Sequence, residues 1–369
     1  MAPPVARKIA VTGGGSAGHI LPAIEFLQTY RRECGATGYF IGCSAGMEGR
    51  LVPASGERLQ TIPGFPWARQ NWIGRVRSLA SIPPAVLAAR RILHRERTEL
   101  VIGAGGYAAF GACLAAYTLG IPVVIHEPNA APGLANRLAA RIATLVCSGF
   151  AEARFHANTA VEVTGVPTGG IEFPAWRGTA PWQFLVLGGS EGSPILNREA
   201  PRLFAELRRR GGDFRVRHLT GLADAAGVAR AYADADVAAE VKQFVEDRAV
   251  IYRDATLAIA SAGAHTMAEL SAAGIPALLV PLPGAANDHQ TANANLYAAR
   301  TGARIVPQSE WNAAEQAGWL AQMLADPARL HRLHEGTLRW QNRNAAQNVV
   351  QACERLLEAR QATARSAQA

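Results

Sequence analysis

The chain has 369 residues, of which 49% are hydrophobic and 18% are charged, and its formal net charge is +8. The apolar fraction is too high for a disordered protein, and the length predicts two domains that each bury a core. No run of about 18 apolar residues is present, as a membrane-spanning helix would need. Segment 1–11 lacks the long apolar stretch of a secretory signal. We therefore expect a soluble two-domain protein.

The cysteine pattern favours a cytoplasmic protein with free thiols. The five cysteines are widely spread and form no C-x-x-C pair, which argues against a disulfide framework or a zinc site. They are Cys34, Cys43, Cys113, Cys147 and Cys353.

The positive net charge indicates an anionic partner, which is nucleic acid, a membrane surface or a phosphorylated ligand. Segment 67–97 concentrates it, with seven arginines against one acid, Glu96. The arginines are Arg69, Arg75, Arg77, Arg90, Arg91, Arg95 and Arg97. The apolar residues among them are Trp67, Trp72, Leu79, Ile82, Val86 and Leu87. This mixture suits a surface that rests on anionic lipid headgroups, and no nucleic-acid module is recognisable.

The first half of the chain opens with a strand, a glycine loop and a helix. Residues 8–12 predict the strand, 13–19 (GGGSAGH) the loop and 22–32 the helix. The amides of such a loop and the N-terminus of the helix can hold a phosphate. No acidic residue follows at the spacing that would hold a nicotinamide ribose.

The same pattern recurs. Residues 100–102 predict a strand that runs into the loop 103–107 (GAGGY), and a helix then reaches Leu119. Residues 122–125 predict another buried strand, followed by 126–129 (HEPN). Alternating buried strands and helices indicate a parallel sheet with both faces covered.

Residues 164–170 (TGVPTGG) break the pattern and predict a linker. The cycle then restarts with a strand at 184–187, a glycine loop at 188–193 (GGSEGS) and a helix at 197–210. A further loop at 261–266 begins a helix that carries Glu269, a strand covers 277–280, and a polar segment follows at 287–294 (NDHQTANA). Residues 345–360 predict an amphipathic helix.

Two such halves predict an α/β protein made of two Rossmann-like domains, with ligands in a cleft between them. We expect the N-terminal domain over residues 1–168 and the C-terminal domain over 169–342. We also expect the helix over 343–360 to pack back on the first domain, and a disordered tail over 361–369.

Five of these segments, at 13–19, 103–107, 126–129, 188–192 and 288–294, occur in an order that resembles the MurG family. The resemblance covers roughly residues 7 to 355. It implies a GT-B fold and a peripheral enzyme on the cytoplasmic face of the inner membrane. That enzyme would transfer N-acetylglucosamine from UDP-GlcNAc to the C4 hydroxyl of the MurNAc of lipid I, giving lipid II with inversion. It implies no cofactor and no metal. The implied partners are UDP-GlcNAc, lipid I and an anionic membrane surface, and not nucleic acid.

The resemblance assigns a donor site and an acceptor site. In the donor site, Gly189 and Ser190 belong to the diphosphate loop, Glu269 binds the ribose, and His289 and Gln290 bind the sugar. The other donor residues it implies are Asn129, Phe244, Val245, Ala264, His265, Thr266 and Asn293. In the acceptor site, His19 is the catalytic residue at the centre of the diphosphate-binding loops. The acceptor residues it implies are Gly14, Gly15, Ser16, Ala17, Gly18, Gly105, Gly106, Tyr107, His126 and Glu127.

Physical chemistry agrees with these roles. Helix N-termini and loop amides stabilise the negative charge that develops on a departing UDP. A carboxylate such as Glu269 has two acceptor oxygens for the two vicinal hydroxyls of a ribose. The attacking hydroxyl must lose a proton, and a histidine such as His19 has an unperturbed pKa of about 6.5.

Four segments depart from the family pattern and keep alternatives open. Residues 165–169 lack an asparagine and an arginine, Ser261 and Ala262 stand where an arginine is usual, and Glu191 and Pro128 each replace a glutamine. Three alternatives are a related transferase with another nucleotide sugar or lipid acceptor, a UDP-GlcNAc epimerase, and a paralogue that binds lipid diphosphate without turnover.

Overall fold

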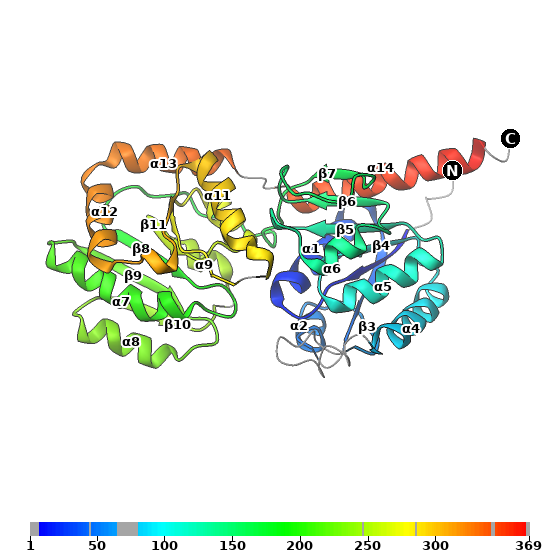
Figure 1. Cartoon of the computed structure of the whole chain (residues 1–369), viewed down its shortest axis with the longest axis horizontal. Coiled ribbons are helices and arrows are strands. Elements are labelled where there is room, and N and C mark those ends of the chain that lie inside the picture. The colour runs from blue at the N-terminus through cyan, green and yellow to red at the C-terminus, as the bar shows by residue number, and fades with distance from the viewer. Residues whose placement is uncertain are drawn as a thin grey trace. The chain divides into compact units, whose positions relative to one another are not determined.

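The computed structural model describes residues 7–43, 46–64, 80–245, 247–284, 286–340 and 344–366. The chain divides into two compact units (Figure 1). Unit 1 comprises residues 1–169 and 344–369, and unit 2 comprises residues 170–343. The two α/β units confirm the expected fold class.

Unit 1 is built on a parallel sheet with the strand order β3-β2-β1-β4-β5-β6-β7. Its described strands are β1 (Lys8–Thr12), β2 (Thr37–Gly42), β3 (Leu59–Thr61), β4 (Leu100–Gly103), β5 (Val123–Glu127), β6 (Leu145–Ser148) and β7 (Val161–Val163). Its described helices are α1 (Ala17–Cys34), α2 (Glu48–Ala54), α4 (Ile82–Arg95), α5 (Tyr107–Thr118), α6 (Leu134–Ala139) and α14 (Ala345–Ser366).

Both faces of this sheet are covered, as its continuous apolar strands predict. Ile9 and Val11 of β1 pack in one core with α1 and α14. Ala10 of the same strand packs in a second core with α4 and α5. Successive side chains of a strand point to opposite faces, so each central strand contributes to both cores.

Helix α14 follows unit 2 in the sequence but packs in unit 1, where Val349, Val350 and Cys353 are buried with α1. Glu354 joins α14 to α1, because Tyr30 Oη donates to its Oε1 at 2.5 Å. Its Oε2 accepts from Nε of Arg7, which precedes β1, at 3.0 Å. The expectation of a disordered tail from residue 361 is wrong as far as residue 366. Helix α14 continues to Ser366, because residues 361–366 contain no proline or glycine to end it. Residues 367–369 lie outside the described part.

Unit 2 repeats the architecture with a parallel sheet of strand order β10-β9-β8-β11-β12-β13. Its described strands are β8 (Trp182–Leu187), β9 (Phe214–Leu219), β10 (Ala239–Lys242), β11 (Leu257–Ala260), β12 (Ala277–Leu279) and β13 (Arg304–Ile305). Its described α-helices are α7 (Pro194–Arg209), α8 (Ala225–Asp234), α9 (Arg248–Tyr252), α10 (Ala264–Ala273), α11 (His289–Thr301), α12 (Ala313–Ala325) and α13 (Pro327–Arg339). Its described 3-10 helices are η1 (Ala286–Asp288) and η2 (Gln308–Glu310).

An aromatic cluster forms the centre of the unit 2 core. Phe184 of β8, Phe204 of α7 and Phe214 of β9 contact one another with ring centroids 5.1 to 5.6 Å apart. Their spacing is typical of aromatic pairs that add to the free energy of burial.

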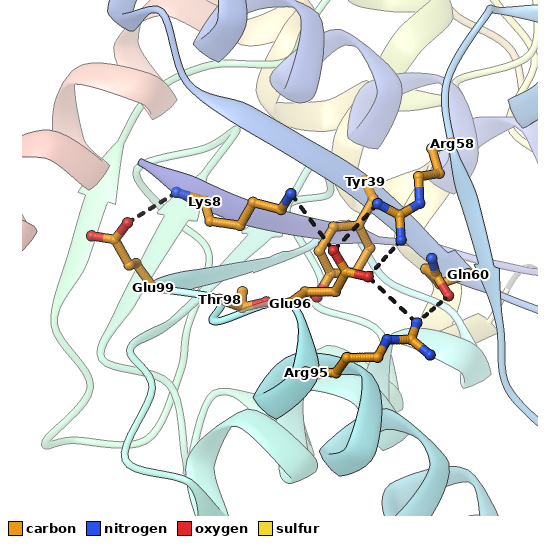
Figure 2. Close-up of polar contacts among 8 residues, drawn as sticks. All are labelled: Lys8, Tyr39, Arg58, Gln60, Arg95, Glu96, Thr98 and Glu99. Carbon is orange, nitrogen blue, oxygen red and sulfur yellow. Dashed lines mark hydrogen bonds and ion pairs between the residues drawn. The ribbon is translucent and has the colours of Figure 1, made fainter. Parts of the chain in front are cut away.

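The part of the arginine-rich segment that the structure describes lies largely on α4. Arg58, Lys8 and Arg95 surround Glu96, with Lys8 Nζ at 3.6 Å and Arg95 Nη2 at 3.4 Å (Figure 2). The hydrogen bond from Arg58 lowers the pKa of Glu96, and the three nearby cations act in the same direction. The cluster lies where β1 and β4 begin, at the sheet edge opposite to the glycine loops. Residues Trp67, Arg69, Trp72, Arg75, Arg77 and Leu79 lie outside the described residues.

A helix must be both long and apolar to cross a bilayer. Among the described residues, no helix is both long enough and apolar enough to cross a membrane.

Candidate active site

In unit 1, two glycine loops meet where the strand order of the sheet reverses. The chain leads from β1 to β2 on one side and from β4 to β5 on the other, and ligands bind at such a point in open parallel sheets. Gly14 N donates to Gly105 O at 3.1 Å, and a Cβ on Gly106 would lie 2.1 Å from Gly14 O. The loops therefore touch, and a side chain at Gly106 would prevent it.

His19 lies in the first turn of α1, beside both loops. Its Nδ1 is 3.0 Å from Gly14 O and 3.1 Å from Ser16 Oγ. Because a carbonyl oxygen can only accept, we assign the proton of the neutral ring to Nδ1, which makes Nε2 the basic nitrogen. Gly105 packs against the ring, since a Cβ there would lie 2.8 Å from His19 Cδ2.

The remaining residues of these loops surround this point. Gly15 adopts a φ of 86°, Ser16 is the N-cap of α1, and Ala17 and Gly18 form its first turn. The first N–H groups of a helix have no intrahelical acceptor, which gives this end its affinity for anions. Tyr107 begins α5 after the second loop, and its side chain lies outside the described part.

Glu48 is a residue of this region that sequence analysis missed. Its side chain is buried in the first turn of α2, and its Oε1 accepts from Gly15 N at 3.3 Å. Its Oε2 has no hydrogen-bond partner among the described residues. Burial raises the pKa of this carboxyl. A glutamate that begins a short helix gives no signal of this contact, because its partner Gly15 lies 33 residues away in the sequence.

Glu127, at the end of β5, organises the next loop. Its Oε1 accepts from Asn129 N and from Asn129 Nδ2, both at 2.9 Å. Its Oε2 accepts from Gly133 N at 3.1 Å and from Asn136 Nδ2 at 3.0 Å. These contacts bring Glu127 and Asn129 together and fix the loop that carries Asn129.

His126, which was expected in the acceptor site, forms a hydrogen bond with the backbone. The ring is buried, and Nε2 donates to Gly165 O at 3.0 Å. Burial lowers its pKa to about 4, so it is neutral at pH 7. His126 thus holds the end of unit 1 that leads into the linker.

Unit 2 has its own pair of glycine loops at the matching point, after β8 and β11. Ser261 N donates to Leu187 O at 2.9 Å, which joins the two strand ends. Gly189 adopts a φ of 81°, and Gly189 and Ser190 are exposed. Ser193 begins α7 as its N-cap and accepts from Leu196 N. The amides and the Ser190 hydroxyl of this loop suit a phosphate.

Helix α10 starts at the second loop with Gly263 as its N-cap, followed by Ala264, His265 and Thr266. Further along this helix, Glu269 is nearly buried. Its carboxylate forms an ion pair with Arg248 and accepts a hydrogen bond from the Tyr252 hydroxyl. Neither partner is predictable from the sequence, because neither lies at a helical or strand spacing from Glu269.

Two residues of α11 hold the same loop from the side. Gln290 Oε1 accepts from Ala262 N at 3.2 Å and from Leu282 N at 2.9 Å. Asn293 is buried, and its Nδ2 donates to Ala262 O at 3.3 Å. Both residues were expected in the donor site, and in the structure both contact the backbone of Ala262. His289 begins the helix and is partly exposed.

Phe244 and Val245 follow β10, at the same edge of the sheet as the glycine loops. The Phe244 side chain is 54% exposed, which is unusual for a large apolar residue. A flat exposed ring at this edge suits a planar base. As for metals, the described residues include no group of three histidine, cysteine or acidic side chains placed to share an ion.

Comparison with known proteins agrees with this geometry. The glycosyltransferase family 28 N-terminal domain matches residues 9–148, and the C-terminal domain of that family matches residues 184–352. A Methylococcus capsulatus protein is 37% identical over 353 residues, which cover 95% of this chain and 98% of that protein. A Tolumonas auensis protein is 36% identical over 362 residues, which cover 96% and 100%. Both are named UDP-N-acetylglucosamine--N-acetylmuramyl-(pentapeptide) pyrophosphoryl-undecaprenol N-acetylglucosamine transferase.

Solved structures show the same relationship. The crystal structure of Acinetobacter baumannii MurG matches with a TM-score of 0.77 at 30% identity, covering 95% of this chain and 99% of that one. UDP-GlcNAc 2-epimerase from Neisseria meningitidis, with a TM-score of 0.66 at 12% identity, shares the fold alone.

Two Rossmann-like units, each with paired glycine loops at its switch point, and full-length glycosyltransferase matches define a GT-B glycosyltransferase. The chain belongs to glycosyltransferase family 28. Within it, the full-length relatives place the chain in the MurG family.

Proposed function

We propose that this protein transfers N-acetylglucosamine from UDP-GlcNAc to the C4 hydroxyl of the MurNAc of lipid I, giving lipid II with inversion. The observation that carries the proposal is the name shared by relatives at 36–37% identity over nearly the full chain. Residues 165–169, Ser261, Glu191 and Pro128 differ from the family pattern, but the chain as a whole keeps 36–37% identity to these relatives.

His19 is the general base in this proposal. Its Nδ1 proton is held by Gly14 O, so Nε2 accepts the proton of the attacking hydroxyl. The imidazolium that forms keeps its hydrogen bond to the same carbonyl, which stabilises the new charge.

The glycine loops of unit 1 bind the diphosphate of the acceptor. The supporting observation is that three elements converge there, namely the loop after β1, the loop after β4 and the N-terminus of α1. Glu127 and Asn129 shape the loop beside it, from which Asn129 contacts the donor sugar.

Unit 2 binds UDP-GlcNAc in the same proposal. The loop 188–193 and the N-terminus of α10 hold the diphosphate, so backbone dipoles stabilise the charge on the leaving UDP. Phe244 and Val245 contact the uracil, and Glu269 binds the ribose. Gln290 and Asn293 act through the backbone of residue 262, which they hold.

A peripheral site on an anionic membrane surface completes the proposal. On α4, Leu87 is 56% exposed and Arg91, one turn later, is also exposed. Arg90 donates to Thr118 of α5, next to the exposed Tyr117. Apolar and cationic side chains together suit lipid headgroups.

The proposal is tested by transfer of radiolabelled GlcNAc from UDP-GlcNAc to a soluble lipid I analogue. We expect product from the wild type, a rate lowered at least about 10²-fold in His19→Ala, and near-normal turnover in the exposed control His156→Ala. No product from the folded wild type would reject the transferase. Interconversion of UDP-sugars without acceptor would identify an epimerase instead.

A further inference from the structure

Glu269 is held by both ends of one short helix. Arg248 begins α9 and Tyr252 ends it, four positions apart, so their side chains share one face. Arg248 Nη2 pairs with Oε1 of Glu269, and the Tyr252 hydroxyl donates to Oε2. Each carboxylate oxygen therefore has a partner of its own.

Helix α9, which carries Arg248 and Tyr252, is fixed by contacts of its own. Asp247 is the N-cap of α9 and accepts from Ala249 N at 3.0 Å. The Tyr252 ring packs edge to face on Phe173, with ring centroids 5.3 Å apart. Burial raises the pKa of Tyr252 to about 12, so its hydroxyl stays protonated and donates. The carboxylate thus receives two donors of fixed direction.

Acceptor capacity remains after these two contacts. An ionised carboxylate has about four lone-pair sites, two on each oxygen. Arg248 and Tyr252 use one on each, which leaves one on each for a ligand. The vicinal hydroxyls of a ribose supply two donors, one for each remaining site.

We propose that Arg248 and Tyr252 are positioning residues that orient Glu269 to recognise the vicinal hydroxyls of the nucleotide ribose. This inference rests on the proposed function, because it assigns the nucleotide to unit 2. Arg248 also supplies a positive charge that offsets Glu269 close to where the nucleotide diphosphate binds. Its side chain is 33% exposed, so it reaches the surface while it pairs.

The test compares the binding of UDP and of 2′-deoxy-UDP by titration calorimetry, which needs no acceptor. The variants are Arg248→Met, Arg248→Lys and Tyr252→Phe. The matched control is Arg253→Met, because Arg253 is exposed and directly follows α9. Urea unfolding checks that each variant is folded.

The wild type should prefer UDP over 2′-deoxy-UDP by about 10- to 100-fold, as expected for a hydrogen bond to a charged group. We expect this preference to fall to about threefold or less in Arg248→Met, through weaker UDP binding. Tyr252→Phe should show a smaller fall, Arg248→Lys should restore part of the preference, and Arg253→Met should match the wild type. In turnover, Arg248→Met should raise KM for UDP-GlcNAc and leave KM for the acceptor unchanged.

Three results would overturn the inference. Arg248→Met could keep the full preference, it could bind UDP more tightly because the arginine blocks the carboxylate, or the wild type could bind both nucleotides equally. If the wild type bound neither nucleotide and made no product, the proposed function itself would fail.

Discussion

Gly105 shows how one missing side chain shapes the proposed active site. Its φ is 97°, and a Cβ there would lie 2.8 Å from Cδ2 and 3.2 Å from Nε2 of His19. The first distance is closer than non-bonded atoms approach. Any side chain at this position therefore displaces the imidazole from Gly14 O.

We predict that Gly105→Ala lowers the rate of transfer by about 10²-fold, because a shift near 1 Å at a reacting group has that effect. UDP binding should stay unchanged, since Gly105 belongs to unit 1. Gly120→Ala is the matched control, because Gly120 also has a positive φ, 69°, but no atom near the added Cβ. If both variants lost transfer rate to the same extent, the cause would be backbone strain and not displacement of the His19 ring.

At the level of elements, a chain of polar side chains crosses unit 2 and ends at the glycine loop 188–193. The Tyr232 hydroxyl of α8 donates to His218 Nδ1 on β9 at 3.0 Å. His218 Nε2 donates to Asn197 Oδ1 at 3.0 Å, and Asn197 Nδ2 donates to Thr220 O at 3.2 Å. Gly192 packs against the same carbonyl, since a Cβ there would lie 2.2 Å from Thr220 O. The chain therefore links α8, β9 and α7 to the loop 188–193.

We predict that Tyr232→Phe lowers the free energy of unfolding by about 1–3 kcal/mol, because buried His218 loses the donor to its Nδ1. Urea unfolding at pH 7.5 measures this change. Tyr117→Phe, on an exposed tyrosine, should change it by less than about 0.5 kcal/mol. A Tyr232→Phe variant as stable as the wild type would show that this hydrogen bond adds nothing.

The element pattern was predictable where apolar runs are long and bounded by glycine. The strand predicted at 8–12 is confirmed as β1, and those at 100–102 and 184–187 are confirmed within β4 and β8. Edge strands such as β3 and β13 were not predicted, because two or three residues carry no periodic signal. Helix α1 begins at Ala17 and not at the predicted Pro22, because a proline within the first turns of a helix does not mark its first residue.

The candidate site was predictable only in part. A glycine loop between a strand and a helix is a signal in neighbouring residues, so the positions of the four loops could be predicted from the sequence. The partners of Glu269 and Gly15 could not, because Arg248 and Glu48 reach them through the tertiary fold. Gln290 and His126 belong to recognisable motifs, but the structure gives both of them contacts with backbone atoms.

At the scale of the whole molecule, each unit has a buried neutral histidine, His126 in unit 1 and His218 in unit 2. Burial lowers their pKa values from 6.5 to about 4 and about 3. Below pH 6.5 the unfolded chain takes up protons that the native protein does not. The stability they contribute is therefore complete above about pH 6.5 and is lost as pH falls toward these pKa values.

We predict that lowering the pH from 7.5 to 5.0 reduces the free energy of unfolding by about 2 kcal/mol for each histidine. Glu48 acts in the opposite direction, because burial raises its pKa and its stability contribution is lost as pH rises. Glu96, whose pKa is lowered by the hydrogen bond from Arg58, acts in the same direction as the two histidines, so we expect the net change to be a loss. Urea unfolding at both pH values should show that His126→Gln and His218→Gln each lose less stability on acidification than the wild type. If both variants kept the wild-type dependence on pH, other groups would have to be the source of the acid sensitivity.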